Sequence, residues 1–492
     1  MRRVTFGGLC AALIGFAATT LAETTPPPGA MGPSTTTPPY LEPLAPGVSF
    51  TSILTAGDAI GQKPDGTPWR MAGAPDGLGA FDNGDGTITV LMDHELKPGA
   101  GVVRRHGFAG AFVSRLVIDK ASLRVTSAGD LIEQAFDYDA ASGRYVPLKT
   151  PLGKLCSADL AGGTAFYDPA SGLGYDGRIF MSGEEQDPEG RPFAHVVTGP
   201  EAGKSYELAA LGNMAFENLV AHPQGGRRTI VGMMEDAHPK GEVYFYAGDK
   251  QATGDAVERA GLAHGRLFGL KIEAMPSEAP VLDPLGPEKA ARFTLVDLGD
   301  VSALSGREID ALRKRNGVTE FLRPEDGAWD TRDPNRFYFN TTATFDQPSR
   351  LWAVDFDDFS QPQKGGTIRI LLRGDEGQHM LDNMTVAENG QVFLQEDPYE
   401  GTYLARIHQF DPKTGALLPL ARHDPALFGK EGALSMDEES SGIIDVTPLL
   451  GGSKQRAFLL TAQPHFQAMR EGKKDVEIVE GGQLLLMRQE TP

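Results

Sequence analysis

Acidic residues follow apolar, strand-like segments at four places in this chain. The segments TITVLMDHEL, RIFMSGEE, TIVGMMED and QVFLQEDP lead into Asp93-His94-Glu95, Glu184-Glu185, Glu235-Asp236 and Glu396-Asp397. Carboxylate oxygens are the ligands that Ca²⁺ and Mg²⁺ prefer, and one Ca²⁺ site takes about six to eight oxygens. The pattern therefore predicts a site for hard cations where these strand ends converge after folding.

Further carboxylates extend this set. Glu217 lies among apolar residues in MAFENLVAHP, where an unpaired buried carboxylate is costly without a partner or a cation. The segments LMDHELKPG and SMDEESSGIIDV are also consistent with solvated loops, and GMMEDAHPKGEVYFYAG with a hairpin turn. The acidic candidates for metal ligands are Glu95, Glu184, Glu185, Glu217, Glu235, Glu325, Asp382, Glu396 and Glu439.

The segment LRPEDGAWD combines a guanidinium with a carboxylate. Arg323 and Glu325 flank a proline, and in an extended segment two side chains two residues apart share a face. A guanidinium beside a metal-bound carboxylate suits a phosphate, which accepts bidentate donors. Arg323 is therefore the first candidate for a catalytic phosphate contact, ahead of Lys154 and Arg104-Arg105, because Lys and Arg are usually solvated at the surface.

The N-terminus has the features of an export signal. Met1-Arg2-Arg3 precedes an apolar stretch and a small-residue cleavage site, and this stretch is too short for a membrane span. We expect a signal peptide over 1–22, a Pro/Thr-rich linker over 23–46 and a periplasmic or secreted protein, with the twin-arginine and general secretory routes both open. No other apolar run reaches about 18 residues, so no membrane span is predicted.

The cysteines and the net charge narrow the functional classes. Of the two cysteines, Cys10 leaves with the signal peptide, so Cys156 is either a buried apolar filler or a thiol held by a metal or a partner. The formal charge of −20 becomes −22 once Arg2 and Arg3 are removed. This charge argues against binding to nucleic acids or anionic membranes and is compatible with bound cations.

Short strand-like segments must position all of these residues. Runs such as 87–92 and 391–394 are separated by turn residues, and 60 glycines and 35 prolines supply the turns. Helical patterns are few, the best being 253–262 and 306–314. We expect an all-β fold, a β-propeller of about six blades with a few short helical insertions, forming a single domain over 47–492. A large β-sandwich or two stacked β domains is the alternative.

Several familiar catalytic motifs are missing from the sequence. It contains no G-x-S-x-G elbow, P-loop, H-E-x-x-H or Rossmann fingerprint. Multiple cations lower the pKa of bound water and neutralise charge on a phosphate, so no protein nucleophile is required. These absences are compatible with hydrolysis of a small phosphoester by metal-bound oxide or hydroxide, and we expect a monomer.

Taken in order, the motifs resemble those of the PhoX-type alkaline phosphatases, over roughly Ala80 to Asp445. The segments concerned are Cys156 with Gly163-Thr164 and Glu184-Glu185, Phe216-Glu217, Glu235-Asp236, Arg323-Pro324-Glu325, and Leu381-Asp382-Asn383 with Glu396-Asp397. The resemblance implies an exported six-bladed propeller with iron and several Ca²⁺ ions in its site. The implied roles are metal ligation by Cys156, Glu217 and Glu325, and phosphate binding by Arg323.

The resemblance is incomplete at two positions. Gly183 stands where the family has a second cysteine, and Gln186 where it has asparagine. We therefore expect a divergent member, with a metal set or an ester preference of its own.

Two other functions stay open at the level of the sequence. A calcium-dependent propeller lactonase or esterase would use similar carboxylates together with a histidine, for which His94 is the candidate, and would need neither Cys156 nor Arg323. A non-enzymatic extracellular binding protein would use calcium for structure alone.

Overall fold

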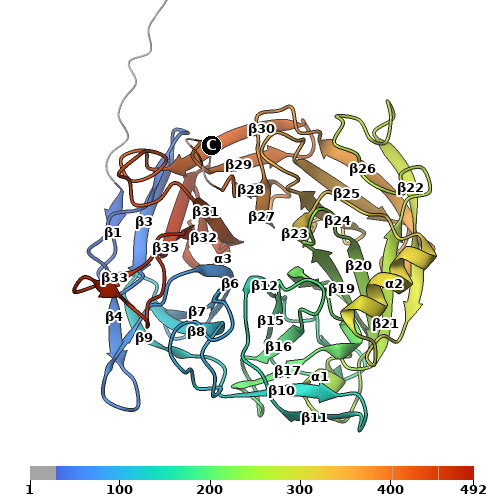
Figure 1. The fold of residues 1–492 in the computed structure, drawn as a ribbon, viewed down its shortest axis with the longest axis horizontal. Coiled ribbons are helices and arrows are strands. Elements are labelled where there is room, and N and C mark those ends of the chain that lie inside the picture. The colour runs from blue at the N-terminus through green and yellow to red at the C-terminus, as the bar shows by residue number, and fades with distance from the viewer. Residues whose placement is uncertain (1–28, 400, 402, 453, 492) are drawn as a thin grey trace, which may run out of the picture.

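The computed structural model describes residues 29–399, 401, 403–452 and 454–491. The main strands of these residues form six antiparallel blades of four strands each around a central axis (Figure 1). Each innermost strand contacts the innermost strand of the next blade, and the last contacts the first, so the ring is closed. The prediction of an all-β, six-bladed propeller is confirmed.

In each of the first three blades, four strands lie in order from the axis outward. Blade one contains β6 (Pro75–Asp82), β7 (Thr87–His94), β8 (Phe112–Asp119) and β9 (Val125–Asp130). Blade two contains β12 (Leu155–Leu160), β15 (Ile179–Glu184), β16 (Pro192–Val196) and β17 (Lys204–Glu207), extended by β10 (Gln134–Asp139) and β11 (Arg144–Pro147). Blade three contains β18 (Phe216–Ala221), β19 (Arg228–Glu235), β20 (Val243–Asp249) and β21 (Gly265–Lys271).

The last three blades follow the same order, and the long strand β22 (Ala290–Gly299) joins blades three and four into one sheet. Blade four contains β23 (Pro324–Trp329), β24 (Arg336–Thr341), β25 (Arg350–Phe356) and β26 (Gly366–Leu372). Blade five contains β27 (Leu381–Val386), β28 (Val392–Glu396), β29 (Arg406–Asp411) and β30 (Ala416–His423). Blade six contains β31 (Glu438–Asp445), β32 (Gln455–Pro464), β35 (Gln483–Glu490) and β3 (Val48–Thr55).

Shorter elements lie outside the four-stranded pattern. They are the strand pairs β4 (Ala59–Gln62) with β5 (Pro68–Arg70), β13 (Tyr167–Asp168) with β14 (Leu173–Gly174), and β33 (Met469–Arg470) with β34 (Lys473–Lys474), the helices α1 (Ala256–Arg259), α2 (Gly306–Asn316) and α3 (Thr447–Leu450), and the 3₁₀ turns η1 (Ala209–Leu211) and η2 (Pro362–Lys364). The helix predicted over 306–314 is present as α2, and of the helix predicted over 253–262 only the four residues of α1 are helical. A capping box opens α2, with Ser305 and Glu308 bonded to each other's backbone N–H groups.

The N-terminal segment takes part in two blades. Strand β3 pairs with β35 and closes the ring, β1 (Ala30–Met31) pairs in parallel with β3, and β2 (Leu41–Pro43) pairs with β30. The described part of the predicted 23–46 linker is therefore not a free linker, because Tyr40 and Leu41 are buried against the propeller. The predicted signal peptide, 1–22, and residues 23–28 lie outside the described residues.

The apolar core fills the spaces between neighbouring blades. Strand residues alternate, so each sheet presents apolar side chains to the sheets on both sides. Between blades three and four, Trp329 makes ring contacts with Phe245, Phe337 and Phe356. This packing makes a rigid scaffold that holds the innermost strands around the axis.

Over the described part of the chain, no helix combines the length and the apolarity that a membrane crossing requires.

Candidate metal centre

At one end of the axis, the blades repeat a local structure that places six side chains in a ring. Each innermost strand starts one residue before its axis-facing side chain. We call these six residues the inner ring: Asp76, Cys156, Glu217, Glu325, Asp382 and Glu439. All are potential metal ligands, and five are carboxylates.

A second ring comes from the residue that follows the second strand of each blade. In every blade its backbone N–H donates to the carbonyl two residues before the inner-ring position, at 2.9–3.0 Å. These donor and acceptor pairs are Glu95 and Ala74, Glu185 and Lys154, Asp236 and Ala215, Thr342 and Arg323, Asp397 and Met380, and His465 and Asp437. We call the six donors the outer ring. The internal repeat that the sequence hides is thus present in the structure.

Irregular backbone turns the inner-ring side chains toward the axis. Five of the innermost strands carry one extra residue opposite their partner strand at the inner-ring position, as between Leu155 and Ala158 in β12. Such β-bulges re-aim side chains and are common beside active sites. Lys154 and Arg323, which lie just before two of these strands, have φ angles of 46° and 59°, in the left-handed region that is unfavourable for side chains other than glycine.

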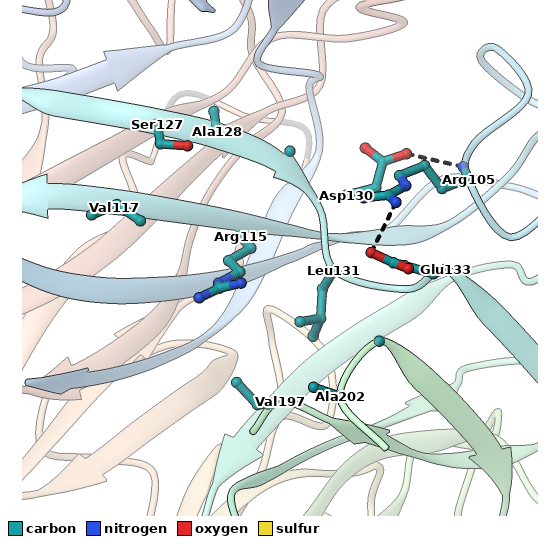
Figure 2. Close-up of a pocket in the computed structure, with 12 residues that line it drawn as sticks. Arg105, Arg115, Val117, Ser127, Ala128, Asp130, Leu131, Glu133, Val197 and Ala202 are labelled. Carbon is teal, nitrogen blue, oxygen red and sulfur yellow. Dashed lines mark hydrogen bonds and ion pairs between the residues drawn. The ribbon is translucent and has the colours of Figure 1, made fainter. Parts of the chain in front are cut away.

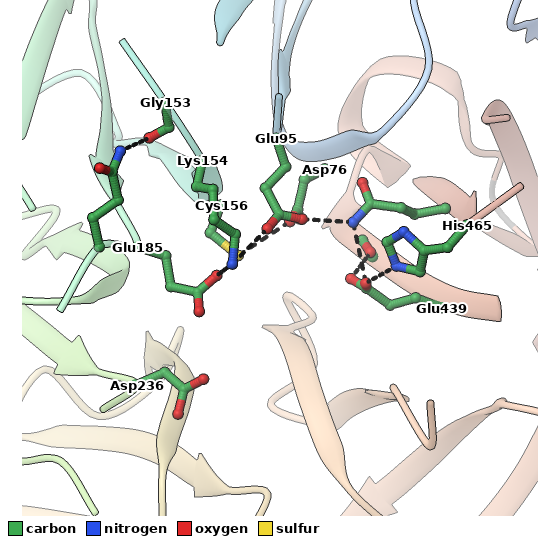
Figure 3. Close-up of polar contacts among 12 residues, drawn as sticks. Asp76, Glu95, Gly153, Lys154, Cys156, Glu185, Asp236, Glu439 and His465 are labelled. Atoms are coloured by element: carbon green, nitrogen blue, oxygen red, sulfur yellow. Dashed lines mark hydrogen bonds and ion pairs between the residues drawn. The ribbon is translucent and has the colours of Figure 1, made fainter. Parts of the chain in front are cut away.

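The ring side chains form three groups whose donor atoms lie within 4.8 Å of one another. Among the described residues, these groups are Asp76, Glu95 and Cys156; Glu217, Glu325 and Asp382; and Asp382, Asp397 and Glu439. Two oxygens bound to one Ca²⁺ at about 2.4 Å lie at most about 4.8 Å apart. The spacing thus fits a shared cation in each group, and Asp382 belongs to two of them. Figure 3 shows the first group together with Glu185, Asp236, Glu439 and His465.

Burial and mutual repulsion shift the protonation of these groups. Burial, followed by neighbouring carboxylates, raises the pKa of Asp76, Glu217, Glu325 and Asp382 well above the usual range. Burial also raises the pKa of Glu185 to about 8 and that of Asp397 to about 7. Bound cations would relieve this repulsion and return the carboxyls to their charged form.

The donor set fits hard cations and, on one side, a softer metal. Oδ1 of Asp76 and Oε1 of Glu217 are buried and have no hydrogen-bond partner among the described residues. An unpaired buried carboxylate oxygen is costly, and a cation would satisfy it. The thiol of Cys156 lies 3.4 Å from Oδ2 of Asp76, and burial raises its pKa, so metal binding must displace its proton.

Two cationic side chains form ion pairs with carboxylates of the rings. Nζ of Lys154 pairs with Glu185 and lies 3.2 Å from Glu95 (Figure 3). Burial lowers the pKa of Lys154, but the carboxylates of Glu95 and Glu185 raise it more, so the ammonium stays charged. Arg323 donates from Nε and Nη2 to the two carboxylate oxygens of Asp236, at 2.8 and 2.6 Å.

His465 adds a third positive group at the outer ring. Its Nε2 lies 3.4 Å from Glu439 and its Nδ1 lies 3.3 Å from Glu480. Burial lowers the pKa of His465, and these two carboxylates raise it by a larger amount, to about 12. The charged imidazolium thereby holds the pKa of Glu439 below its usual value despite burial.

Three predicted ligands point away from the axis, because they occupy the last position of a second strand. Glu184 accepts hydrogen bonds from Nε and Nη2 of Arg191 at 2.7 and 2.8 Å. Glu396 accepts from the Tyr403 hydroxyl and from His408 at 2.9 Å each. The Glu235 carboxylate accepts from the Tyr244 hydroxyl at 3.2 Å and lines a cavity with His238 and Arg313. The structure does not bring these carboxylates into the three groups.

The other predicted residues do converge, and five members of the rings were not among the predicted ligands. Lys154 and Arg323 lie beside the rings. The predicted ligands that lie in the rings are Cys156, Glu95, Glu185, Glu217, Glu325, Asp382 and Glu439. The missed members are Asp76, Asp236, Thr342, Asp397 and His465. Alternation along a strand could have found Asp236 and Asp397. Adjacent strand residues face opposite sides, so if Glu185 faces the axis, the second residue of each equivalent acidic pair must face it too.

Two basic or titratable candidates lie away from the axis. His94 is fully buried, stacks on Phe112, and hydrogen-bonds to the Gly73 carbonyl at 2.8 Å and to Ser114 at 2.7 Å. Arg105 pairs with Glu133 at 2.8 Å beside a cavity of about 380 Å³ lined by β8, β9 and residues of blade two (Figure 2). Among the described residues, no hydrogen bond or ion pair joins either side chain to a ring side chain.

Comparison with known proteins gives a structural match. No protein-family model matches the chain, and no curated protein sequence does. PhoX of Pseudomonas fluorescens, in complex with vanadate, a transition-state analogue, matches with a TM-score of 0.61 and 11% identity, over 94% of this chain and 97% of that chain. This likeness supports the propeller fold.

Two other solved structures match less closely. Trypanosoma rangeli sialidase with sialic acid gives a TM-score of 0.36 and 9% identity, over 90% of this chain and 59% of that chain. The α-L-arabinofuranosidase of Podospora anserina with cellotriose gives 0.31 and 9% identity, over 89% of this chain and 96% of that chain.

Proposed function

We propose that this protein is a metal-dependent phosphoester hydrolase, a divergent PhoX-type alkaline phosphatase that acts in the periplasm or outside the cell. The observation that carries the proposal is the pair of rings, in which six blades present acidic and thiol side chains to one point beside Lys154 and Arg323. The fold likeness to a PhoX protein solved with a transition-state analogue supports the same reading.

The groups differ in the metal that they suit. Asp76, Glu95 and Cys156 combine two carboxylates with a thiol, and thiolates favour transition metals, so we assign a transition metal to this group. The resemblance to the PhoX-type phosphatases implies that this metal is iron. The two groups that share Asp382 contain only carboxylates, so we assign Ca²⁺ to them. Glu185 and Asp236 are not in these groups; Glu185 pairs with Lys154, and Asp236 pairs with Arg323.

The bound metals would supply Lewis acidity and a water of lowered pKa for attack on phosphorus. The chain's own part is to bind and orient the ester. Asp236 and Glu325 hold the Arg323 guanidinium at 2.6 and 3.3 Å, and its Nη1 has no hydrogen-bond partner among the described residues. We assign to that nitrogen and to Nζ of Lys154 the role of donors to non-bridging phosphate oxygens.

The charge of both donors is maintained by their carboxylate partners. Burial lowers the pKa of Arg323, and Glu325 and Asp236 raise it more, so it remains protonated throughout the working range. The partners also fix the direction of each cation before substrate arrives, and such preorganised charge stabilises the developing negative charge of the transition state. No equivalent observation favours a lactonase, because its candidate histidine, His94, is buried away from the rings.

Hydrolysis of p-nitrophenyl phosphate by the purified protein, with metal analysis of the same sample, tests the proposal. We expect hydrolysis, with calcium and iron both present. Arg323→Ala should lower kcat/KM about 10²-fold with the metals retained, while Arg336→Ala, which removes an arginine paired with Asp355 on the same blade, should leave it unchanged. Calcium alone with lactone hydrolysis, or metal without any hydrolysis, would overturn the proposal.

A further inference from the structure

Next to the inner ring, further along the innermost strands, four polar side chains form a layer across the axis. Each directly follows an inner-ring residue in the chain, and each is almost completely buried. We call them the polar layer: Ser157, Asn218, Asp326 and Asn383, which follow Cys156, Glu217, Glu325 and Asp382. The bulges explain the arrangement, because an extra residue lets two consecutive side chains approach the axis.

The polar layer is a hydrogen-bonded unit that spans five blades. Oγ of Ser157 accepts from Nδ2 of Asn218 at 3.2 Å and from Nδ2 of Asn383 at 3.0 Å. Asn218 also donates to Oδ1 of Asp326 at 2.7 Å, and Oδ2 of Asp326 accepts from the backbone N–H of Met384 at 2.9 Å. Oδ1 of Asn383 accepts a hydrogen bond from the backbone N–H of Gly442, in blade six, at 3.0 Å. Ser157 is the hub that joins both amides.

In the two blades that contribute no side chain to this layer, a glycine lets neighbouring innermost strands approach closely. A Cβ atom on Gly77 of blade one would lie 2.2 Å from the Ala158 nitrogen, and one on Gly442 would lie 2.1 Å from the Asp76 carbonyl oxygen. On the far side of the layer is a cavity of about 80 Å³, lined by Ser157, Asn218 and other residues of the innermost strands. The layer thus separates the rings from a space large enough for water.

We propose that the polar layer positions the metal ligands. Consecutive Cα atoms are about 3.8 Å apart, so fixing one side chain across the axis also fixes the ligand next to it in the chain. Ser157 thereby sets the distances among Cys156, Glu217 and Asp382, which come from three different blades. The inference rests on the metal centre of the proposed function but not on the reaction carried out there.

Titration of metal-depleted protein with Ca²⁺ in a calorimeter tests this role. Ser157→Ala removes the oxygen that both amides need, and we expect Ca²⁺ affinity to fall about 10–100-fold, the usual effect of removing a group that orients a ligand. Ser157→Thr keeps the hydroxyl and can place its methyl in the adjoining cavity, so affinity should stay within about threefold of the original. The matched control is Ser205→Ala. Ser205 lies on β17, far from the innermost strand, and its buried hydroxyl is hydrogen-bonded to His195.

A role in stability alone would give a different result. Both alanine variants should lower the Tm of the metal-depleted protein, but only Ser157→Ala should reduce the rise in Tm that Ca²⁺ produces. Equal Ca²⁺ affinity in Ser157→Ala and the original protein, equal losses in both alanine variants, or no Ca²⁺ binding by the original protein would overturn the inference. Ca²⁺ binding without phosphoester hydrolysis would instead refute the proposed function and leave this inference standing.

Discussion

Adjacent carboxylates at the strand ends have opposite surroundings. In the pairs Glu184-Glu185 and Glu396-Asp397, the first residue ends a second strand and is saturated by protein donors, while the second enters the outer ring among other carboxylates. The residue types are nearly identical, and only the face of the strand differs. Position in the pleat therefore separates a carboxylate that holds the fold together from one that is available to a cation.

Chelation should have the largest effect, because it acts on every inward carboxylate at once. We expect removal of metal by EDTA to lower hydrolysis of p-nitrophenyl phosphate by about 10³-fold or more, with activity restored by added Ca²⁺ and iron. Addition of Mg²⁺ alone serves as the control. Full activity of the chelated protein would abolish the distinction between inward and outward carboxylates.

The stability of the chelated protein should also depend on pH. The pKa values of Glu185 and Asp397 are raised to about 8 and about 7, above those of an unfolded chain, so the folded state binds more protons between about pH 4 and 8. The free energy of unfolding should therefore be greatest near pH 4–5 and fall as the pH rises to 8. Denaturant titrations at several pH values measure this slope, and saturating Ca²⁺ should remove it. A chelated protein that gains stability from pH 5 to 8 would contradict the account.

Neutralising one member of a pair sharpens the comparison. Asp397→Asn should reduce kcat/KM about 10²-fold without destabilising the chelated protein, because it removes a ligand and a source of repulsion together. Glu396→Gln should leave kcat/KM within about threefold but lower the free energy of unfolding by about 2–3 kcal/mol, since its buried carboxylate accepts several hydrogen bonds. Kinetics and urea unfolding on both variants separate the two roles, and matching results in the pair would refute them.

Residue types predict much of this site, but they do not say which residue of each acidic pair faces the axis. Short strand-like runs separated by glycines and prolines were sufficient to predict a propeller. Carboxylates at strand ends, Cys156 and the Arg323-Pro324-Glu325 segment led to the prediction of a metal site, and most of these residues do converge. The choice between Glu235 and Asp236 depends on which residue faces the axis, and strand alternation decides it only relative to a residue whose direction is already known, such as Glu185. Asp76 was missed because APDGLG has the composition of an ordinary turn.

The thiol provides a more selective change within the rings. Cys156→Ser should remove iron and leave calcium in place, because a hydroxyl is a poor ligand for a transition metal and the other two groups contain no sulfur. We expect about a tenfold loss of kcat/KM. Metal analysis of the purified variant is the measurement, and unchanged iron content would show that Cys156 is an apolar filler.

The smallest effect on hydrolysis should come from an outward carboxylate. Glu184→Gln breaks a nearly buried ion pair with Arg191, so we expect a loss of about 3–5 kcal/mol in the free energy of unfolding. In the folded variant, kcat/KM and metal content should match those of the original protein. A selective loss of metal with normal stability would place Glu184 among the ligands after all.

Metal counting in the original protein and in Asp382→Asn tests the central claim most directly, because Asp382 is shared by two of the three groups. The account predicts several metal equivalents per chain in the original protein, calcium among them. It also predicts that Asp382→Asn loses at least two of these equivalents while keeping the metal beside Cys156. Equal metal content in the two proteins, or no bound metal in the original, would contradict it.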